Sequence, residues 1–96
     1  MVEFLVTYRF ESQEDRDGFY GEIKSKGIKR LCEDEEGCIR YDYFYPCDDE
    51  KVLFLLEQWE TMEHQKVHTS QPHFGELGKL KDKYNCNTEV EINGFE

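Results

Sequence analysis

The sequence has few basic residues. Its 96 residues include 12 Lys and Arg against 22 Asp and Glu, which leaves a formal net charge of −10 at pH 7. Binding to a nucleic-acid backbone depends on Lys and Arg that neutralise phosphates, and anionic membrane surfaces attract the same side chains. The composition therefore argues against a nucleic acid and against a membrane surface as the partner of this chain.

Long hydrophobic runs are also missing. No apolar stretch approaches the roughly 18 residues that a transmembrane helix needs, and residues 1–5 lack the basic start of a signal peptide. We therefore predict a cytoplasmic protein with reduced cysteines. The cysteine spacing fits no zinc-ribbon or redox motif, so we interpret all four as buried or half-buried thiols: Cys32, Cys38, Cys47 and Cys86.

The chain is short enough to form one domain, spanning residues 1–96. Apolar and polar residues alternate from Val2 to Phe10, which predicts a strand. Ser12 is a suitable N-cap for a helix that continues to about Glu33. Further strands are expected over 38–45, 51–59 and 88–92, and helices over 61–70 and 72–84. The order β-α-β-β-α-β predicts an α+β fold of the ferredoxin-like type, an antiparallel sheet with helices on one face.

The strand over residues 51–59 is apolar on both of its faces. One face carries Val52, Phe54 and Leu56, and the other carries Leu53, Leu55 and Trp59. A strand with this pattern is buried on both sides, but the helices cover only one face of so small a sheet. We therefore expect the other face to pack against a second copy of the chain in a two-fold homodimer.

All three histidines fall within ten residues of one another. His64 and His68 are four residues apart and share one face of a predicted helix, and His73 follows Pro72. The three could bind a metal, cap helices at the surface, or act as an acid or base in a pocket. A zinc site needs three or four converging ligands, and no carboxylate or cysteine has a convincing spacing to complete one. We therefore predict no metal site.

Glu57 and the only tryptophan, Trp59, share one face of their strand. A glutamate on an otherwise apolar face is either solvated at the sheet edge or paired with Arg9, Arg40 or a histidine. The next strand presents a tyrosine face, Tyr41, Tyr43 and Tyr45, which suits an interface or a wet pocket. We interpret the acidic runs at residues 33–36 and 48–50 as solvated loops.

Several of these residues together resemble a known family. The motif Leu56-Glu57-Gln58-Trp59-Glu60-Thr61, followed by His64, His68 and Pro72-His73-Phe74, is similar to the signature of the antibiotic biosynthesis monooxygenase superfamily, and Gly37-Cys38 matches its usual glycine. The resemblance extends from the first strand to about Tyr84. It implies a dimeric ferredoxin-like barrel. Some members oxygenate quinols or anthrone-like compounds with O2 and no metal or flavin, others isomerise small phosphorylated sugars, and others bind or degrade haem.

The resemblance also implies roles for individual residues. Trp59, His68 and His73 occupy matching positions and are the predicted catalytic group, with His68 as the base. We expect Tyr8, Glu57, His64 and Tyr41 to contact the substrate. Haem-degrading relatives need an Asn where Tyr8 stands, which disfavours haem.

The leading hypothesis is a monooxygenase of small aromatic or quinol substrates that uses no cofactor. The first alternative is an isomerase of a small carbonyl compound, with Arg9 and Arg40 available for a phosphate. The second alternative is a non-catalytic ligand-binding dimer.

Overall fold

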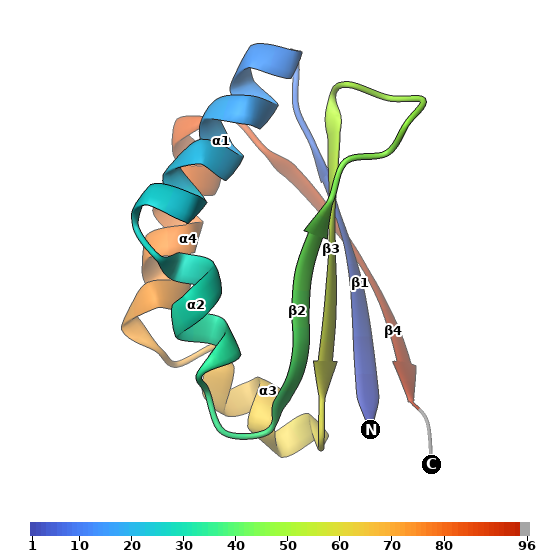
Figure 1. The fold of residues 1–96 in the computed structure, drawn as a ribbon, viewed down its shortest axis with the longest axis vertical. Coiled ribbons are helices and arrows are strands. Elements are labelled where there is room, and N and C mark those ends of the chain that lie inside the picture. Colours follow the sequence, from blue (N-terminus) through green and yellow to red (C-terminus); the bar gives the residue numbers. More distant parts are fainter. Residues whose placement is uncertain (95–96) are drawn as a thin grey trace.

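A four-stranded antiparallel sheet carries the helices on one of its faces in the computed structural model, which describes residues 1–94 (Figure 1). The strand order in the sheet is β2-β3-β1-β4. This arrangement confirms the α+β ferredoxin-like prediction. The elements in chain order are β1 (Val2–Arg9), α1 (Gln13–Ser25), α2 (Ile28–Glu33), β2 (Cys38–Phe44), β3 (Val52–Trp59), α3 (Met62–His68), α4 (Pro72–Lys83) and β4 (Asn87–Gly94).

The helix predicted from residue 13 to about residue 33 is in fact two helices. Gly27 adopts a left-handed conformation with φ of 67° between α1 and α2, and residues other than glycine rarely tolerate this conformation. The break turns α2 toward the end of the sheet where β2 begins. The predicted N-cap is confirmed, because the Ser12 side chain accepts a hydrogen bond from the Asp15 backbone N–H. The last strand is longer than predicted and continues to Gly94.

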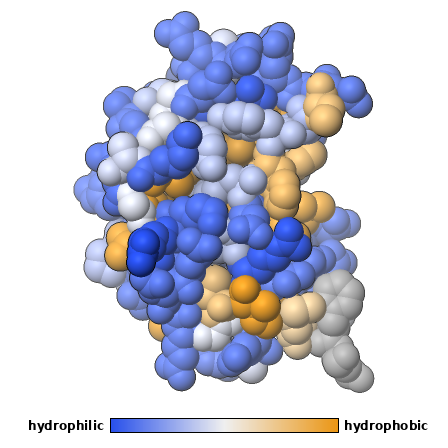
Figure 2. All heavy atoms as spheres, in the orientation of Figure 1, coloured by the Kyte–Doolittle hydropathy of each residue, from blue (hydrophilic) through white to orange (hydrophobic). Residues whose placement is uncertain are grey.

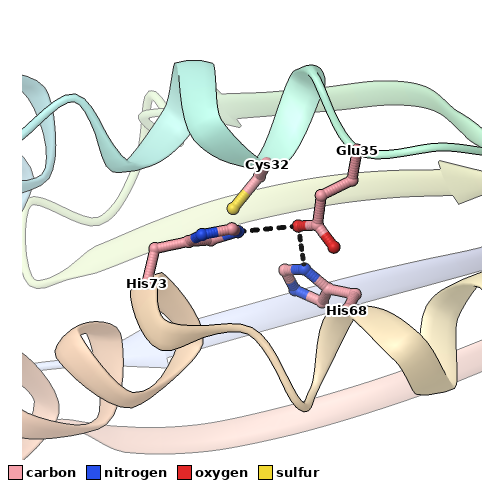
Figure 3. Close-up of side chains that lie close together, drawn as sticks. All are labelled: Cys32, Glu35, His68 and His73. Atoms are coloured by element: carbon pink, nitrogen blue, oxygen red, sulfur yellow. Dashed lines mark hydrogen bonds and ion pairs between the residues drawn. The ribbon is translucent and has the colours of Figure 1, made fainter.

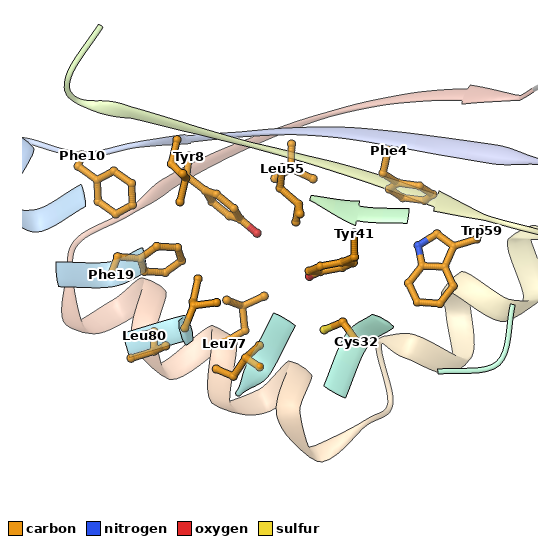
Figure 4. Close-up of a cluster of buried hydrophobic side chains, with 14 of the residues drawn as sticks. Phe4, Tyr8, Phe10, Phe19, Cys32, Tyr41, Leu55, Trp59, Leu77 and Leu80 are labelled. Carbon is orange, nitrogen blue, oxygen red and sulfur yellow. The ribbon is translucent and has the colours of Figure 1, made fainter. Parts of the chain in front are cut away.

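The core lies between the sheet and the helices (Figure 4). Alternate residues of β1 point into it, as their pattern predicts, and Tyr8 and Phe10 contact Phe19 of α1 with ring centroids 5.3 and 5.2 Å apart. Trp59, at the end of β3, is fully buried. Aromatic rings bury large areas, so they form a substantial core in a chain of this length.

The face of the sheet opposite the helices is partly apolar. Phe54 and Leu56 of β3 are half-buried there, and Phe44 of β2 is 44% exposed. Figure 2 shows hydrophobic residues at the surface on the side where Figure 1 draws the strands, whereas the helical side is mainly hydrophilic. The prediction that β3 is apolar on both faces is confirmed, and only one of these faces is covered by helices.

Two further predictions concern the whole chain. No helix among residues 1–94 is long and apolar enough to cross a membrane. All four cysteines are free thiols, but Cys47 is exposed. The interpretation of every cysteine as buried or half-buried is therefore wrong for Cys47, which lies in the turn between β2 and β3.

Candidate functional site

His68 lies at the centre of a group of aromatic rings. It is the last residue of α3 and is only 1% exposed. Its ring centroid is 4.9 Å from that of Trp59, 5.7 Å from Tyr41 and 5.2 Å from Phe74. The Thr61 N-cap and the short α3 helix deliver His68 to this place directly after β3 ends. A buried imidazole needs polar partners for both ring nitrogens, and each of them faces a carboxylate.

On one side, the Nδ1 atom of His68 is 2.6 Å from Oε2 of Glu35. The same oxygen is 2.8 Å from Nε2 of His73, in the first turn of α4. The Cys32 thiol completes the group, and the four side chains point toward one another across the space between α2 and the α3–α4 segment (Figure 3). This cluster joins two predicted catalytic residues, His68 and His73, to two residues that the sequence did not single out.

Glu35 and Cys32 were missed for identifiable reasons. The acidic run at residues 33–36 was interpreted as a solvated loop, which is wrong for Glu35, whose side chain is only 11% exposed. The argument that no carboxylate or cysteine accompanies the histidines is also wrong, because the fold supplies both: Cys32 lies in α2, and Glu35 lies in the turn that follows α2. The one local signal was Gly37, which ends the acidic run and brings Glu35 against α3.

On the other side, the Nε2 atom of His68 is 4.0 Å from Oε1 of Glu57. Glu57 is only 6% exposed, and its Oε1 accepts a hydrogen bond of 3.0 Å from Nε1 of Trp59. Of the predicted partners, the histidine is the one that the structure brings to Glu57. Burial raises the pKa of Glu57 above its ordinary value, although the Trp59 hydrogen bond and the nearby His68 oppose this. A raised pKa makes its carboxylate a stronger base.

A cavity of about 120 Å³ opens next to Glu57. His68 is not among the lining residues, and Glu57 stands between it and the cavity. The lining is mainly aromatic and apolar, with a few polar groups: Phe4, Val6, Tyr8, Tyr41, Glu57, Gln65, Phe74, Leu77, Lys81, Thr88 and Val90.

Two tyrosines direct their hydroxyls into the space beside this cavity. Tyr8 and Tyr41 are 2% and 1% exposed, and Figure 4 shows their hydroxyls pointing into the space between the two rings. Within residues 1–94, the Tyr41 hydroxyl has no hydrogen-bond partner. Burial raises the pKa of both tyrosines well above the ordinary value, so both stay protonated and able to donate.

Lys81 is a further cavity residue that sequence reasoning missed. It projects from α4, and its Nζ atom lies 5.4 Å from the centre of the Tyr8 ring. Burial lowers the pKa of Lys81. A half-buried ammonium group at the wall of an aromatic cavity favours a ligand that carries negative charge. No sequence signal separated Lys81 from the other lysines of its helix.

Three residues lie away from this site. His64 was predicted to contact the substrate, but its Nδ1 is 2.7 Å from the Thr61 hydroxyl and its ring packs against Gly37, outside the cavity lining. Arg9 and Arg40, considered for a phosphate, form ion pairs of 3.0 and 2.6 Å with Glu89 and Asp42. Neither arginine lines the cavity.

Comparison with known proteins agrees with this fold. Residues 3–79 match the model of the family described as "Antibiotic biosynthesis monooxygenase". Among solved structures, a conserved protein of unknown function from Bacteroides thetaiotaomicron is 22% identical, with a TM-score of 0.86 over 98% of this chain and 96% of that one. A conserved protein from Methanosarcina mazei is 24% identical, with a TM-score of 0.83 over 100% and 94%.

A third similar structure is a mutant of a cofactor-independent oxygenase from Streptomyces nogalater. It is 10% identical, with a TM-score of 0.77 over 99% of this chain and 92% of that one. No significant match was found among curated proteins. At these identities the structural likeness establishes the shared fold.

Proposed function

The chain belongs to the antibiotic biosynthesis monooxygenase family, and from this premise we propose that it oxidises a small, acidic aromatic compound with O2 and without a cofactor. The observation that carries the proposal is Glu57, a buried carboxylate with a raised pKa at the wall of an aromatic cavity. Such a carboxylate can remove a weakly acidic proton from a bound ring.

The proposed reaction begins with proton transfer to Glu57. An anthrone-like or quinol-type substrate that loses a proton becomes an electron-rich anion, which can transfer an electron to O2. For an anthrone-like substrate, recombination forms a carbon–oxygen bond and a peroxide anion, which takes back the proton held by Glu57 and becomes a hydroperoxide. The hydroperoxide then loses its C–H proton and its distal OH as water, so that the CH2 becomes a carbonyl with one atom of O2 and the other atom leaves as water. A quinol has no CH2, and loss of its two electrons and two protons to O2 gives the quinone and H2O2.

His68 supports this step from behind Glu57. Its Nε2 faces Glu57 at 4.0 Å, and its Nδ1 is hydrogen-bonded to Glu35 at 2.6 Å. This chain of groups leads from the cavity to Glu35, which is partly exposed, and offers a route by which a proton can be shared and released. The predicted base is thus assigned a relay role, and Glu57 is the group that touches the substrate. His73 holds Glu35 in place.

The remaining cavity groups suit an anionic intermediate. The hydroxyls of Tyr8 and Tyr41 can donate hydrogen bonds to a substrate oxygen that gains negative charge, and Lys81 adds a positive charge nearby. Groups that are already oriented stabilise developing charge without reorganisation. Trp59 fixes Glu57 through its indole N–H.

We also propose that the protein is a homodimer that pairs through the uncovered face of its sheet. Half-buried Phe54 and Leu56 lie on this face. Exposed apolar patches of this kind are typical of protein interfaces.

The isomerase alternative loses the two arginines considered for its phosphate, because Arg9 and Arg40 are paired with carboxylates away from the cavity. The binding-module alternative remains an outcome of the test below.

Oxygen uptake tests the proposal. Purified protein is given trimethylhydroquinone, menadiol or anthrone in the presence of a chelator, and uptake is compared with the spontaneous rate. The proposal expects faster uptake, and for the anthrone one atom of labelled O2 in the product. Ligand binding without any uptake would favour the non-catalytic dimer. Turnover of a keto-phosphate without oxygen would favour the isomerase.

A further inference from the structure

The Cys32 cluster has the composition of a metal site. We propose that it binds one divalent transition-metal ion with the ligand preference of zinc, through four side chains: Cys32, Glu35, His68 and His73. Their candidate ligand atoms all lie within 4.8 Å of one another. Zinc sites in proteins use this set of sulfur, nitrogen and oxygen ligands, and usually take four of them.

The spacing of the four atoms fits a tetrahedral ion after small movements. Zinc bonds of about 2.0–2.3 Å separate neighbouring ligand atoms by roughly 3.3–3.6 Å. The carboxylate oxygen of Glu35 now lies 2.6 Å from His68 and 2.8 Å from His73, where it holds the two rings facing each other. The Cys32 sulfur points toward the same space from α2 (Figure 3). An ion would push the Glu35 oxygen away from the two rings by about 1 Å or less, and would draw the most widely separated ligand atoms, which lie up to 4.8 Å apart, closer by about 1 Å.

The charges and the surroundings also fit. A thiolate and a carboxylate together neutralise a dication, and the two imidazoles bind in their neutral form. Cys32 and His68 are buried, whereas Glu35 and His73 are 11% and 12% exposed in their side chains. The site is therefore enclosed on the core side and has an entry path on the other side.

The second ring nitrogen of His68 provides an independent indication. A histidine that binds a metal almost always directs its other nitrogen to a carboxylate or carbonyl, which orients the ring. His68 Nδ1 faces the cluster, and its Nε2 lies 4.0 Å from Glu57 Oε1. Glu57 would complete a carboxylate–histidine–metal arrangement if it moved close enough to accept a hydrogen bond from His68.

The ion would sit on the side of His68 that faces away from the cavity, so it would not touch the substrate. A bound ion would occupy Nδ1 of His68, which the proposed proton relay to Glu35 also uses. The proposed oxidation is therefore a property of the metal-free protein. The metal site itself does not depend on that oxidation. Metal content and spectra measure it directly, without turnover.

The test uses the full chain, stripped with a chelator and then given Zn²⁺ or Co²⁺ alone. We expect one ion per chain after dialysis. With Co²⁺ we expect the strong visible bands of a tetrahedral site and a near-ultraviolet sulfur-to-cobalt band. Zn²⁺ should raise the melting temperature, because a ligand that binds only the folded state stabilises it.

Matched variants identify the ligands. Cys32→Ser should abolish the sulfur-to-cobalt band, and His73→Asn should lower the affinity by at least tenfold. Cys38→Ser and His64→Ala replace a cysteine and a histidine outside the cluster and should leave both readouts unchanged. Circular dichroism of the metal-free variants checks their folding, and the half-buried His73 provides the test if Cys32→Ser does not fold. Less than one ion per chain, a spectrum that survives Cys32→Ser, or binding lost in His64→Ala would overturn the proposal.

Discussion

Replacing Gly37 with alanine should destabilise the protein by about 2–3 kcal/mol. Gly37 has φ of 81°, and a Cβ atom there would lie 2.2 Å from Cγ of His64. A left-handed conformation costs a residue other than glycine about 1–2 kcal/mol. Relief of the clash requires movement of His64, which would break its 2.7 Å hydrogen bond with the Thr61 side chain, and a bond of this kind contributes about 0.5–1.5 kcal/mol.

The effect should also reach the functional site. The Gly37 carbonyl accepts a hydrogen bond of 2.8 Å from the Glu60 backbone N–H. This contact joins the start of β2 to the end of β3, and so holds Glu35 against the helix that carries His68. We therefore expect Gly37→Ala to weaken the Glu35–His68 hydrogen bond as well as the fold.

Thermal and urea unfolding measure the loss. For a domain of this length, 2–3 kcal/mol corresponds to a decrease in melting temperature of roughly 10–20 °C. Gly21→Ala is the matched control, because it lies in α1 with nothing within 4 Å of the added Cβ, and it should stabilise the helix by about 0.5–1 kcal/mol. The double variant Gly37→Ala/His64→Ala should recover part of the loss. An unchanged melting temperature in Gly37→Ala would refute the reasoning.

Three further predictions concern Glu57, His68 and the uncovered face of the sheet. Burial raises the pKa of Glu57, so the folded state holds this proton more tightly than the unfolded chain, and ionisation above the ordinary glutamate pKa costs stability. Glu57→Gln should therefore be more stable than the wild type at neutral pH but not in acid, as urea titrations at both pH values would show. His68→Gln should lower the rate of oxygen uptake by about 10²–10⁴, whereas His64→Ala should leave it nearly unchanged. Light scattering should give a dimer, whose interface would bury roughly 1,200–2,000 Å², and Leu56→Arg on the uncovered sheet face should give a monomer.

Much of the fold could be predicted from local patterns. The alternation in β1 and the Ser12 cap are properties of short segments, and the structure confirms them. The break between α1 and α2 was harder to predict from the sequence, because a single helix could also have tolerated Gly27 at a cost of about 1 kcal/mol. The structure shows the turn, with Ile28 and Cys32 of α2 buried after it.

The site residues also fall into those that the sequence could bring together and those that only the fold does. Trp59, His68 and Glu57 lie in one continuous segment, so the sequence could bring them together before the fold was known. Cys32 and Glu35 reach His68 across 36 and 33 positions of the chain, and only the fold, which brings α2 and the turn after it to the α3–α4 segment, places them there. Their exposure could not be deduced from the acidic residues around them. Lys81 was indistinguishable from its neighbours for the same reason.

The most direct test of the central claim is the rate of oxygen uptake by Glu57→Gln, with the substrate that the wild-type protein oxidises fastest. Glutamine keeps the shape of the side chain and can accept the Trp59 hydrogen bond, but it cannot take a proton. If Glu57 removes the substrate proton, the rate should fall by about 10²–10⁴ while the variant stays folded and still binds the substrate. A folded variant that retains the wild-type rate would contradict the account.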